Sequence, residues 1–326
     1  MIITRTPFRI SFVGGGSDLK EFYSIYPGAV LSTSINKYMY ISSHRFFEPD
    51  KIRAKYAITE TVDHIDDLKH PIIREALRKY NIPGGFEISS IADIPSGTGM
   101  GSSSAFTVGL LNNLHASTRK YASKEEIAEE ACHMEIDILK EPIGKQDQYA
   151  AAMGGLNILR FNTNGKVTVE PLYLNGEVYK KLQENLVLFY IGNARKASDI
   201  LSEQKRNIGQ EEKFENLRKM VTLVDELKNS LYREDLNNFG KLLHENWILK
   251  QKLASKISNP QINELYDLGL RNGAIGGKLL GAGGGGFMLF YCEKSLQPKL
   301  KGAIKARHFD FKFDEEGTKL VYFGDE

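Results

Sequence analysis

The sequence is poor in cysteine, and this scarcity bears on the compartment in which the protein works. Only Cys132 and Cys292 occur among its 326 residues. Proteins held together by disulfides carry more cysteine and belong to oxidising compartments, so a disulfide scaffold is implausible and a reducing compartment is expected. Residues 1–7 (MIITRTP) lead directly into strand-like sequence, without the basic and then apolar segments of a secretory signal. We therefore expect a cytoplasmic protein.

Long apolar runs and a strong net charge are also missing. No run approaches the length that spans a bilayer, so no membrane partner is expected. The formal net charge is only +2, which creates no global field that would draw the chain to nucleic acid. The seven histidines are scattered without the spacing of zinc ligands, which argues against a zinc hydrolase.

What is present is the composition of a folded globular protein, with 41% hydrophobic and 26% charged residues. A chain of this length exceeds one average domain, so we expect two, residues 1–182 and 183–326, with the boundary near Leu182; the alternative is a single large domain. Strand-like sequence dominates the first ninety residues, for example 38–44 and 86–91, whereas helical periodicity dominates the second half. The pattern predicts a mixed α and β fold.

One predicted helix has a well-defined start. Ser123 and Glu126 form a capping box, in which each side chain satisfies a free N–H group near the other residue. The apolar positions that follow lie on one face at helical spacing: Ile127, Ala131, Met134 and Ile138. Glu135 falls at the edge of this face, and Pro142 is expected to end the helix.

The strongest functional signal is a segment of alternate glycines that runs into serines, residues 94–105 (IPSGTGMGSSSA). Glycines allow backbone N–H groups to converge on an anion, and the N-terminus of the following helix also favours a phosphate. Serine hydroxyls there can contact a hard cation such as Mg²⁺. The candidate phosphate-binding residues are Pro95, Gly97, Gly99, Gly101, Ser102, Ser103 and Ser104.

Other glycine-based motifs do not fit. A Walker-type P-loop needs a lysine after its last glycine, but Ser102 follows Gly101. Residues 281–286 (GAGGGG) match the spacing of a dinucleotide fingerprint, yet the apolar residues that follow predict a strand where that motif needs a helix. The sequence after Gly101 also lacks the second glycine of a nucleophile elbow.

Together, three segments resemble the ordered motifs of the GHMP kinase superfamily, along essentially the whole chain. Residues 6–18 (TPFRISFVGGGSD) are similar to its first motif, 95–105 to its second and 278–286 to its third. Within the superfamily, residues 6–18 and 144–149 look like D-glycero-D-manno-heptose 7-phosphate kinases. The resemblance implies an α+β fold of two domains, the N-terminal one like ribosomal protein S5 domain 2 and the C-terminal one ferredoxin-like, with ATP between them.

The resemblance also implies catalytic and metal-binding roles. Ser103 matches the serine that binds Mg²⁺ in the second motif, and Glu135 precedes Asp147 by twelve residues, the spacing in galactokinases between the second Mg²⁺ ligand and the catalytic aspartate. Asp147, expected in a loop beyond the helix, would orient the acceptor hydroxyl and accept its proton. Arg9 or Lys145 would lie close enough to keep Asp147 ionised.

The substrate-binding residues are expected in three places. In the first motif, Asp18 matches an aspartate that binds sugar hydroxyls, and Ser17 precedes it. Where galactokinases carry Glu-His, this chain has Gly15 and Gly16, which argues against galactose and leaves room for a bulkier substrate. The other candidates are Gly283 and Gly284 in a loop that closes on the substrate, and Arg195 and Ser198, which offer a cation and a hydroxyl to a distant phosphate.

The expected reaction is transfer of a phosphoryl group from ATP, with Mg²⁺, to the anomeric hydroxyl of a heptose 7-phosphate. The product, a 1,7-bisphosphate, would feed nucleotide-activated heptose synthesis. Two alternatives remain open. One is another sugar 1-kinase, of the fucose or glucuronate type, and the other is a non-catalytic sensor of sugar and ATP. The expected partner is therefore a small sugar phosphate, bound by a monomer or homodimer.

Overall fold

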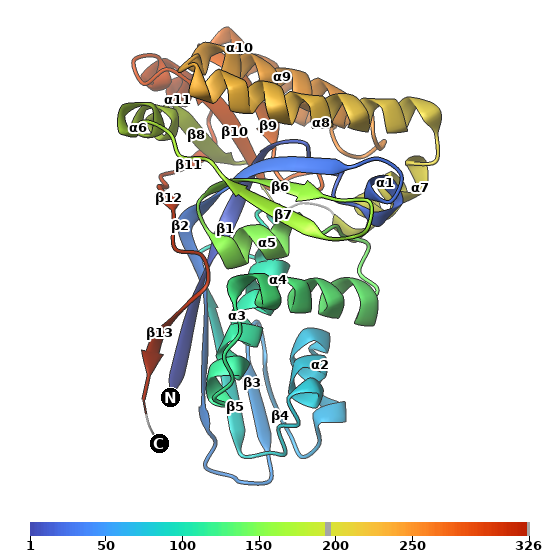
Figure 1. Ribbon diagram of the computed structural model, residues 1–326. Helices are drawn as coiled ribbons and strands as arrows, with labels where there is room; N and C mark the ends of the chain where they lie inside the picture. Colours follow the sequence, from blue (N-terminus) through green and yellow to red (C-terminus); the bar gives the residue numbers. More distant parts are fainter. Residues whose placement is uncertain (193–196, 325–326) are drawn as a thin grey trace.

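The computed structural model describes residues 1–192 and 197–324, which fold into two β-sheets and the helices that cover them (Figure 1). Within these residues, no helix combines the length and apolar character needed to cross a bilayer. Buried apolar side chains of both sheets and their helices form one continuous core. The two parts of the molecule are therefore packed together rather than joined only by a linker.

The first sheet has nine strands and is built around the long strand β2. Its strands are β1 (Ile2–Val13), β2 (Gly28–Arg45), β3 (Ile52–Lys55), β4 (Thr59–Val62), β5 (Phe86–Ala92), β6 (Leu156–Phe161), β7 (Val167–Pro171), β12 (Phe313–Asp314) and β13 (Lys319–Phe323). The main order is β13-β1-β2-β5-β3-β4. One end of β2 pairs with β5, where Tyr40 faces Ile91, and the other end pairs with β6, where Leu31 faces Ile158. β2 therefore joins the two ends of this sheet.

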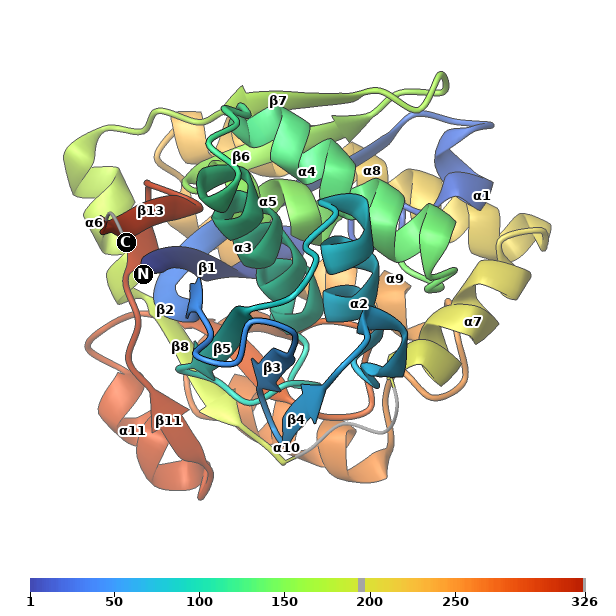
Figure 2. The same cartoon turned by 90° about the horizontal axis from the view of Figure 1, so that it is seen from below.

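Helices cover one face of the first sheet (Figure 2). They are α2 (Pro71–Lys79), α3 (Ser102–Ser117), α4 (Lys124–Cys132) and α5 (Gln146–Met153), while α1 (Lys20–Tyr23) and a 3-10 turn (Ile65–Asp67) are short connections. α3 packs against β1 and β2 on one side and against α4 and α5 on the other. This position explains why residues 104–111 of α3 are all buried. The predicted capping box at Ser123 and Glu126 is confirmed, with both of its hydrogen bonds present.

The predicted helix after Ser123 does not continue as a regular α-helix. α4 ends at Cys132, and a π-helical turn (His133–Ile138) follows. The wider turn shifts the inward face, so Glu135 is fully buried whereas Ile138, predicted in the core, is 41% exposed. The prediction for Ile138 is therefore wrong, and Glu135 lies deeper than its place at the edge of the apolar face indicated.

The second sheet has four antiparallel strands with helices packed on it. Its strands are β8 (Leu186–Tyr190), β9 (Ala274–Leu279), β10 (Phe287–Cys292) and β11 (Arg307–Phe309), in the order β11-β8-β10-β9. The helices of this half are α6 (Gly176–Glu184), α7 (Ala197–Asn207), α8 (Glu211–Tyr232), α9 (Leu236–Gln251), α10 (Pro260–Arg271) and α11 (Gln297–Ala303). α9 packs on β9 and also reaches β1 of the first sheet.

The end of the chain returns to the first sheet. β12 pairs with β2, where Phe313 faces Ile35, and β13 pairs with β1 at the edge. The second sheet does begin just after the proposed boundary at Leu182, but residues 313–323 belong to the first sheet. The two units are therefore not both continuous in sequence. The amide of Gly324 donates to the carbonyl of Met1 (2.9 Å), so the ends of the described chain lie together.

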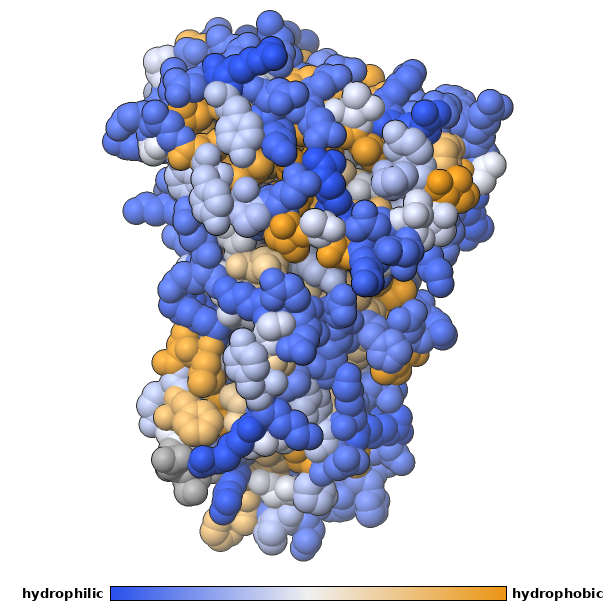
Figure 3. All heavy atoms as spheres, viewed as in Figure 1, coloured by the Kyte–Doolittle hydropathy of each residue, from blue (hydrophilic) through white to orange (hydrophobic). Residues whose placement is uncertain are grey.

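The exposed edge at β13 is also one of the apolar places on the surface. Leu320, Val321, Tyr322 and Phe323 are each between 41% and 52% exposed. Apolar side chains gather near this edge in the space-filling view, on a face that is otherwise mostly hydrophilic (Figure 3).

Candidate active site

The glycine-serine segment of the second motif forms a loop between two cavities. Gly97, Ser102 and Ser103 line both cavities. One, the aromatic cavity, has a volume of about 750 Å³, and its other lining residues include Pro95 and several aromatic side chains. The other, the polar cavity, is lined by residues of all three glycine-rich motifs. The predicted phosphate-binding residues are thus brought together where the two cavities meet.

The backbone of this loop suits an anion. Gly97, Gly99 and Gly101 have φ angles of 74°, 82° and 75°. Residues other than glycine rarely adopt this backbone conformation. Gly101 occupies the cap position before α3, and no side chain caps the N–H groups of the first turn. Free N–H groups and the helix dipole both favour negative charge there. The start of α3 at Ser102 therefore offers a phosphate site.

Arg9 and Asp147 form a bidentate ion pair beside the loop. Arg9 Nε donates to Asp147 Oδ1 (2.7 Å), and a terminal nitrogen donates to Oδ2 (2.8 Å). The other terminal nitrogen donates to the carbonyl of Gly99 (2.8 Å). Arg9 is buried, while a quarter of the Asp147 side chain remains accessible. Asp147 lies in the first turn of α5 rather than in the predicted loop, and both residues line the polar cavity.

Lys145 does not share this position. Its Nζ donates to the carbonyl of Gly165 (2.7 Å) and lies over the ring of Tyr23. The expectation that Lys145 helps to hold Asp147 ionised is therefore not met. Arg9 contacts Asp147 instead, and its planar guanidinium binds both carboxylate oxygens.

A buried carboxylate lies directly behind the start of α3. Glu135 Oε1 accepts from the hydroxyl of Ser103 (2.8 Å), and Oε2 accepts from Gln148 Nε2 (2.7 Å). Burial raises the pKa of Glu135 to about 7, although hydrogen bonds from Ser103, Ser104 and Gln148 oppose the rise. Ser103 and Glu135 are thus adjacent, as the predicted pair of Mg²⁺ ligands requires.

This pair fits a magnesium ion chemically. Within the described chain, no positively charged side chain forms an ion pair with Glu135. A divalent cation would supply the missing charge. Mg²⁺ prefers oxygen ligands and is usually held by one or two carboxylates together with substrate phosphates. Glu135 and Ser103 offer a carboxylate and a hydroxyl beside the loop that we expect to bind phosphates.

Asp18 also lines the polar cavity. Its carboxylate accepts hydrogen bonds from the amide of Gly16 (3.0 Å) and from Gln146, whose Nε2 lies 3.0 Å away. Burial, and then the charge of Asp147, raise the pKa of Asp18. Gly15 and Gly16 line the cavity beside it, so these three candidate substrate-binding residues come together.

Ser17 is different, because its side chain is fully buried and already bonded. Its hydroxyl donates to the carbonyls of Gly14 (2.8 Å) and Ala29 (3.0 Å), and it does not line the cavity. Ser17 therefore holds the first-motif turn against β2. The structure contradicts its predicted contact with substrate.

The third motif contacts the second directly. A Cβ added to Gly281 would lie 2.3 Å from the Cα of Gly99, so the two loops touch through their backbones. Gly281 and Ala282 line the polar cavity. Gly283 and Gly284, the predicted contacts, turn away instead, and the amide of Gly284 donates to the carbonyl of Ile257 (3.0 Å). The third motif therefore lies at the cavity, but Gly281 and Ala282 line it in place of the predicted Gly283 and Gly284.

Of the two residues predicted to bind the distant phosphate, the structure describes one. Ser198 lies in the first turn of α7 and lines the polar cavity. Arg195 lies outside the described residues. The contribution of Arg195 therefore stays a prediction.

Two lysines in the polar cavity were missed. Lys250 comes from α9 and Lys278 from β9, and both are buried. A signal for Lys250 was present in the sequence, because it continues the buried stripe of α9 three residues after Trp247. Lys278 is the first residue of the third motif. That its side chain lines the cavity could not be read from the sequence, because this depends on where β9 lies in the fold.

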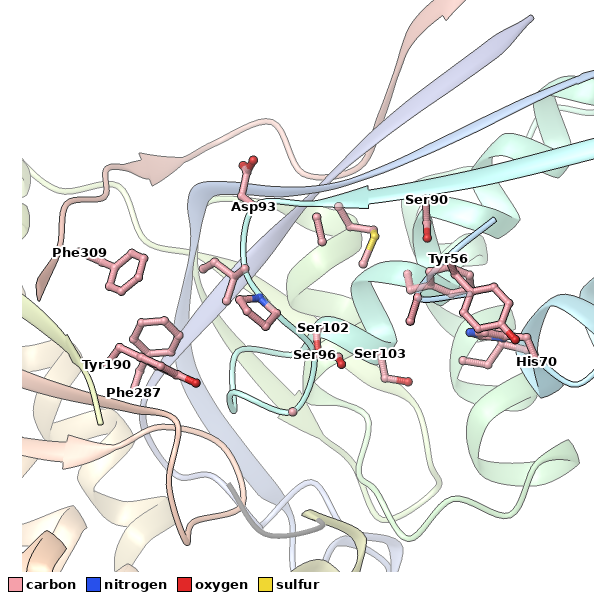
Figure 4. Close-up of a pocket in the computed structure, with 18 of the residues that line it drawn as sticks. Tyr56, His70, Ser90, Asp93, Ser96, Ser102, Ser103, Tyr190, Phe287 and Phe309 are labelled. Carbon is pink, nitrogen blue, oxygen red and sulfur yellow. The ribbon is translucent and has the colours of Figure 1, made fainter. Parts of the chain in front are cut away.

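The aromatic cavity was not anticipated either. Figure 4 shows Tyr56 and His70 on one side of the second-motif loop. The ring of His70 stacks on Phe106 at 4.9 Å, and Tyr56 meets it edge-on at 4.7 Å. On the other side lie three further aromatic residues, Tyr190, Phe287 and Phe309 (Figure 4). The loop thus borders a cavity lined by aromatic side chains, which suits a planar ring.

The amino-acid sequence is similar to known protein families and to individual kinases. Two family models match the chain, GHMP kinases N terminal domain over residues 68–155 and GHMP kinases C terminal over residues 223–310. The D-glycero-alpha-D-manno-heptose 7-phosphate kinase of Campylobacter jejuni is 30% identical over 98% of both chains. The L-fucokinase/L-fucose-1-P guanylyltransferase of Bacteroides fragilis is 25% identical over 87% of this chain and 34% of that protein.

Solved structures agree on the fold. The crystal structure of a D-glycero-D-manno-heptose 1-phosphate kinase from Bacteriodes thetaiotaomicron matches with a TM-score of 0.81 at 24% identity, over 100% of both chains. The predicted α+β fold of two parts is confirmed, and so is the resemblance drawn from the three motifs. The chain belongs to the GHMP kinase family.

Proposed function

We propose that this protein transfers the γ-phosphoryl group of ATP to the anomeric hydroxyl of D-glycero-D-manno-heptose 7-phosphate. The observation that carries the proposal is the Arg9–Asp147 pair, which presents a carboxylate to the polar cavity beside a phosphate-binding loop. GHMP kinases use ATP as the phosphate donor. The 30% identical relative from Campylobacter jejuni supports the heptose 7-phosphate as acceptor.

In this proposal Asp147 orients the acceptor hydroxyl and accepts its proton. Phosphoryl transfer passes through a loose transition state, so positioning and charge neutralisation contribute more than covalent chemistry. Arg9 fixes both oxygens of Asp147 and also binds the carbonyl of Gly99 in the phosphate loop. The orientation of the carboxylate is thereby tied to the position of the nucleotide phosphates.

The nucleotide would lie across the loop. Its adenine would enter the aromatic cavity, on the side where Tyr56, His70 and Phe106 gather. Its phosphates would pass over Gly97 to the start of α3, because both cavities meet there. Mg²⁺, held by Glu135 and Ser103, would neutralise phosphate charge.

The acceptor would occupy the polar cavity. Asp18 would bind sugar hydroxyls, and Gly15 and Gly16 would leave space for the longer carbon chain of a heptose. Ser198, together with Arg195, would bind the distant phosphate. The product would serve nucleotide-activated heptose synthesis. We keep a cytoplasmic location and a monomeric or homodimeric state as predictions.

A second candidate is a fucose 1-kinase, since the Bacteroides fragilis relative and one from Arabidopsis thaliana are fucokinases. A glucuronate kinase is a further alternative of the same sugar 1-kinase type. A non-catalytic sensor is disfavoured because Arg9, Ser103, Glu135 and Asp147 are all present and adjacent in the expected pairs.

The test is ADP formation with Mg²⁺ and ATP against a panel of acceptors: D-glycero-D-manno-heptose 7-phosphate, mannose, fucose, galactose and mevalonate. The proposal expects selective turnover of the heptose phosphate. Turnover of fucose alone would replace the acceptor while keeping the kinase. No turnover with any acceptor, while ATP still binds, would favour the sensor.

A further inference from the structure

Two buried lysines face the polar cavity without a carboxylate partner. The Lys250 and Lys278 residues are only 6% and 2% exposed. Lys250 Nζ donates to the carbonyls of Leu279 (3.2 Å) and Gly281, and Lys278 Nζ donates to the carbonyl of Phe12 (2.9 Å). In the part of the chain that the structure describes, neither amine forms a salt bridge. Both nevertheless line the cavity that contains Asp147 and Gly99.

Of the acidic residues that line this cavity, Asp18, Glu141 and Asp147, the one whose charge acts on Lys250 is Asp147, and it is already engaged. Asp147 accepts two hydrogen bonds from Arg9, so its charge is largely balanced by the guanidinium. Burial lowers the pKa of Lys250 to about 7, with Arg9 adding to the effect and Asp147 opposing it. Burial, Lys250 and Arg9 lower the pKa of Lys278 well below its usual value. Lys250, Lys278 and Arg9 therefore place three basic groups together, beside one aspartate that is already paired.

Burying amines without an anionic partner destabilises their charged form. A buried cation is stable only when it is paired, and an amine that loses its proton instead gives up its charge. Both residues line the polar cavity, and their amines bind backbone carbonyls rather than carboxylates. An anionic ligand would restore the missing charge and allow both amines to be protonated.

The position of the amines indicates which anion fits. Lys250 binds the carbonyl of Gly281, and Gly281 lies against Gly99 of the phosphate loop. The amines therefore lie at the junction of the second and third motifs. Each ammonium group has three donors, and a phosphate offers several acceptor oxygens and up to two negative charges.

We propose that Lys250 and Lys278 form a binding subsite for a phosphate dianion at the junction of the second and third glycine-rich loops. The phosphate comes either from the nucleotide, as its terminal group, or from a phosphorylated acceptor. The choice between these sources rests on the proposed function. The subsite itself does not, because inorganic phosphate can probe it without any turnover.

The test is calorimetric titration of inorganic phosphate into the full-length protein, at a pH slightly above the lowered pKa of Lys250. Two buffers with different ionisation enthalpies reveal whether protons are taken up. The wild-type protein is expected to bind phosphate and to take up protons on the lysine amines. Lys250→Met and Lys278→Met are each expected to weaken binding by about tenfold or more and to reduce proton uptake.

A matched control is Lys213→Met. Lys213 Nζ also donates to a backbone carbonyl, that of Lys252 (2.6 Å), but Lys213 does not line the cavity. This variant should bind phosphate like the wild-type protein. Lys250→Gln provides a second uncharged variant, and circular dichroism checks that each variant is folded. Wild-type binding without proton uptake, no wild-type binding, or unchanged binding in folded Lys250 and Lys278 variants would overturn the subsite.

A second pair of titrations identifies the source of the phosphate. If the terminal phosphate of the nucleotide occupies the subsite, Lys250→Met weakens binding of a non-hydrolysable ATP analogue but not of AMP. If the acceptor phosphate occupies it, the variant weakens binding of the heptose 7-phosphate but not of the unphosphorylated heptose. Either result supports the subsite, and unchanged binding of both phosphorylated ligands would contradict it. A failure to phosphorylate heptose would sink the proposed acceptor but leave the phosphate titration decisive.

Discussion

At the scale of single residues, the site contains a carboxylate that is held in one orientation and is still accessible to a ligand. Arg9 holds both oxygens of Asp147, yet a quarter of the aspartate side chain can still be reached from the cavity. A general base must lie within hydrogen-bond reach of the proton that it accepts. Orientation by Arg9 therefore supports the proposed role more directly than a change in basicity would.

The variant Asp147→Asn tests this role. An amide has nearly the same shape but does not accept a proton from the hydroxyl, so kcat is expected to fall by roughly 10²–10⁴. The matched control is Asp137→Asn, which removes an exposed carboxylate that pairs only with His133 among the described contacts. Steady-state kinetics with saturating ATP provide the measurement. Near-normal turnover of Asp147→Asn would contradict the assignment.

Lys250 predicts a pH-dependent stability. Burial lowers its pKa from an ordinary value of 10.5 to about 7 in the folded state, so the unfolded chain binds more protons between these values. The free energy of unfolding should therefore rise with pH across this window, because the folded amine is already neutral and the unfolded chain gives up its proton more readily as the pH rises. Lys250→Met removes the cost of burying this amine, which amounts to at most about 5 kcal/mol below pH 7.

We expect Lys250→Met to be more stable than the wild-type protein near pH 7, with a difference that shrinks as the pH approaches 10. Urea denaturation at several pH values measures the difference. Arg9, Asp147 and Lys278 face the same space and are unchanged in the variant. A difference in stability that stays constant with pH would contradict a buried, deprotonated Lys250.

At the scale of elements, the site depends on contact between two loops. Gly281 has a φ of 69°, and its Cα faces the backbone of Gly99 so closely that no side chain fits between them. Gly281→Ala is therefore expected to push the third motif away from the second. The KM for ATP should rise by about tenfold, and stability should fall by about 1 kcal/mol or more.

The control for Gly281→Ala is Gly302→Ala. Gly302 lies in α11, and an added Cβ meets nothing within 4 Å. Its kinetics should match the wild-type protein, and alanine in a helix should cost no stability. Equal KM values for ATP in Gly281→Ala and the wild-type protein would show that contact between the loops does not shape the nucleotide site.

The elements also show what sequence alone can predict. The glycine-rich loops and the capping box at Ser123 were predictable because these residue types report local backbone needs. The π-helical turn that buries Glu135 was not, since no local residue pattern reports it, and the turn packs against α2 as well as α4. Residue type likewise did not show that the hydroxyl of Ser17 points into the first-motif turn. The direction of a side chain is a property of tertiary structure.

At the scale of the whole molecule, the site lies where the two sheets share one core. Arg9 comes from β1 of the first sheet, whereas Lys278 comes from β9 of the second (Figure 1). The polar cavity therefore draws residues from both parts of the fold. Long-range pairing, such as the return of β13 to β1, also escaped prediction because no local pattern reports it.

The proposed reaction of the whole protein is phosphorylation of the anomeric hydroxyl of a heptose 7-phosphate. The most direct measurement is phosphorus NMR of the reaction with ATP, Mg²⁺ and D-glycero-D-manno-heptose 7-phosphate. We expect a new phosphate signal coupled to the anomeric proton, beside the unchanged signal of the 7-phosphate, and a much slower appearance of that signal with Asp147→Asn. A new phosphate at another hydroxyl, or no new sugar phosphate while ATP is bound, would contradict the claim.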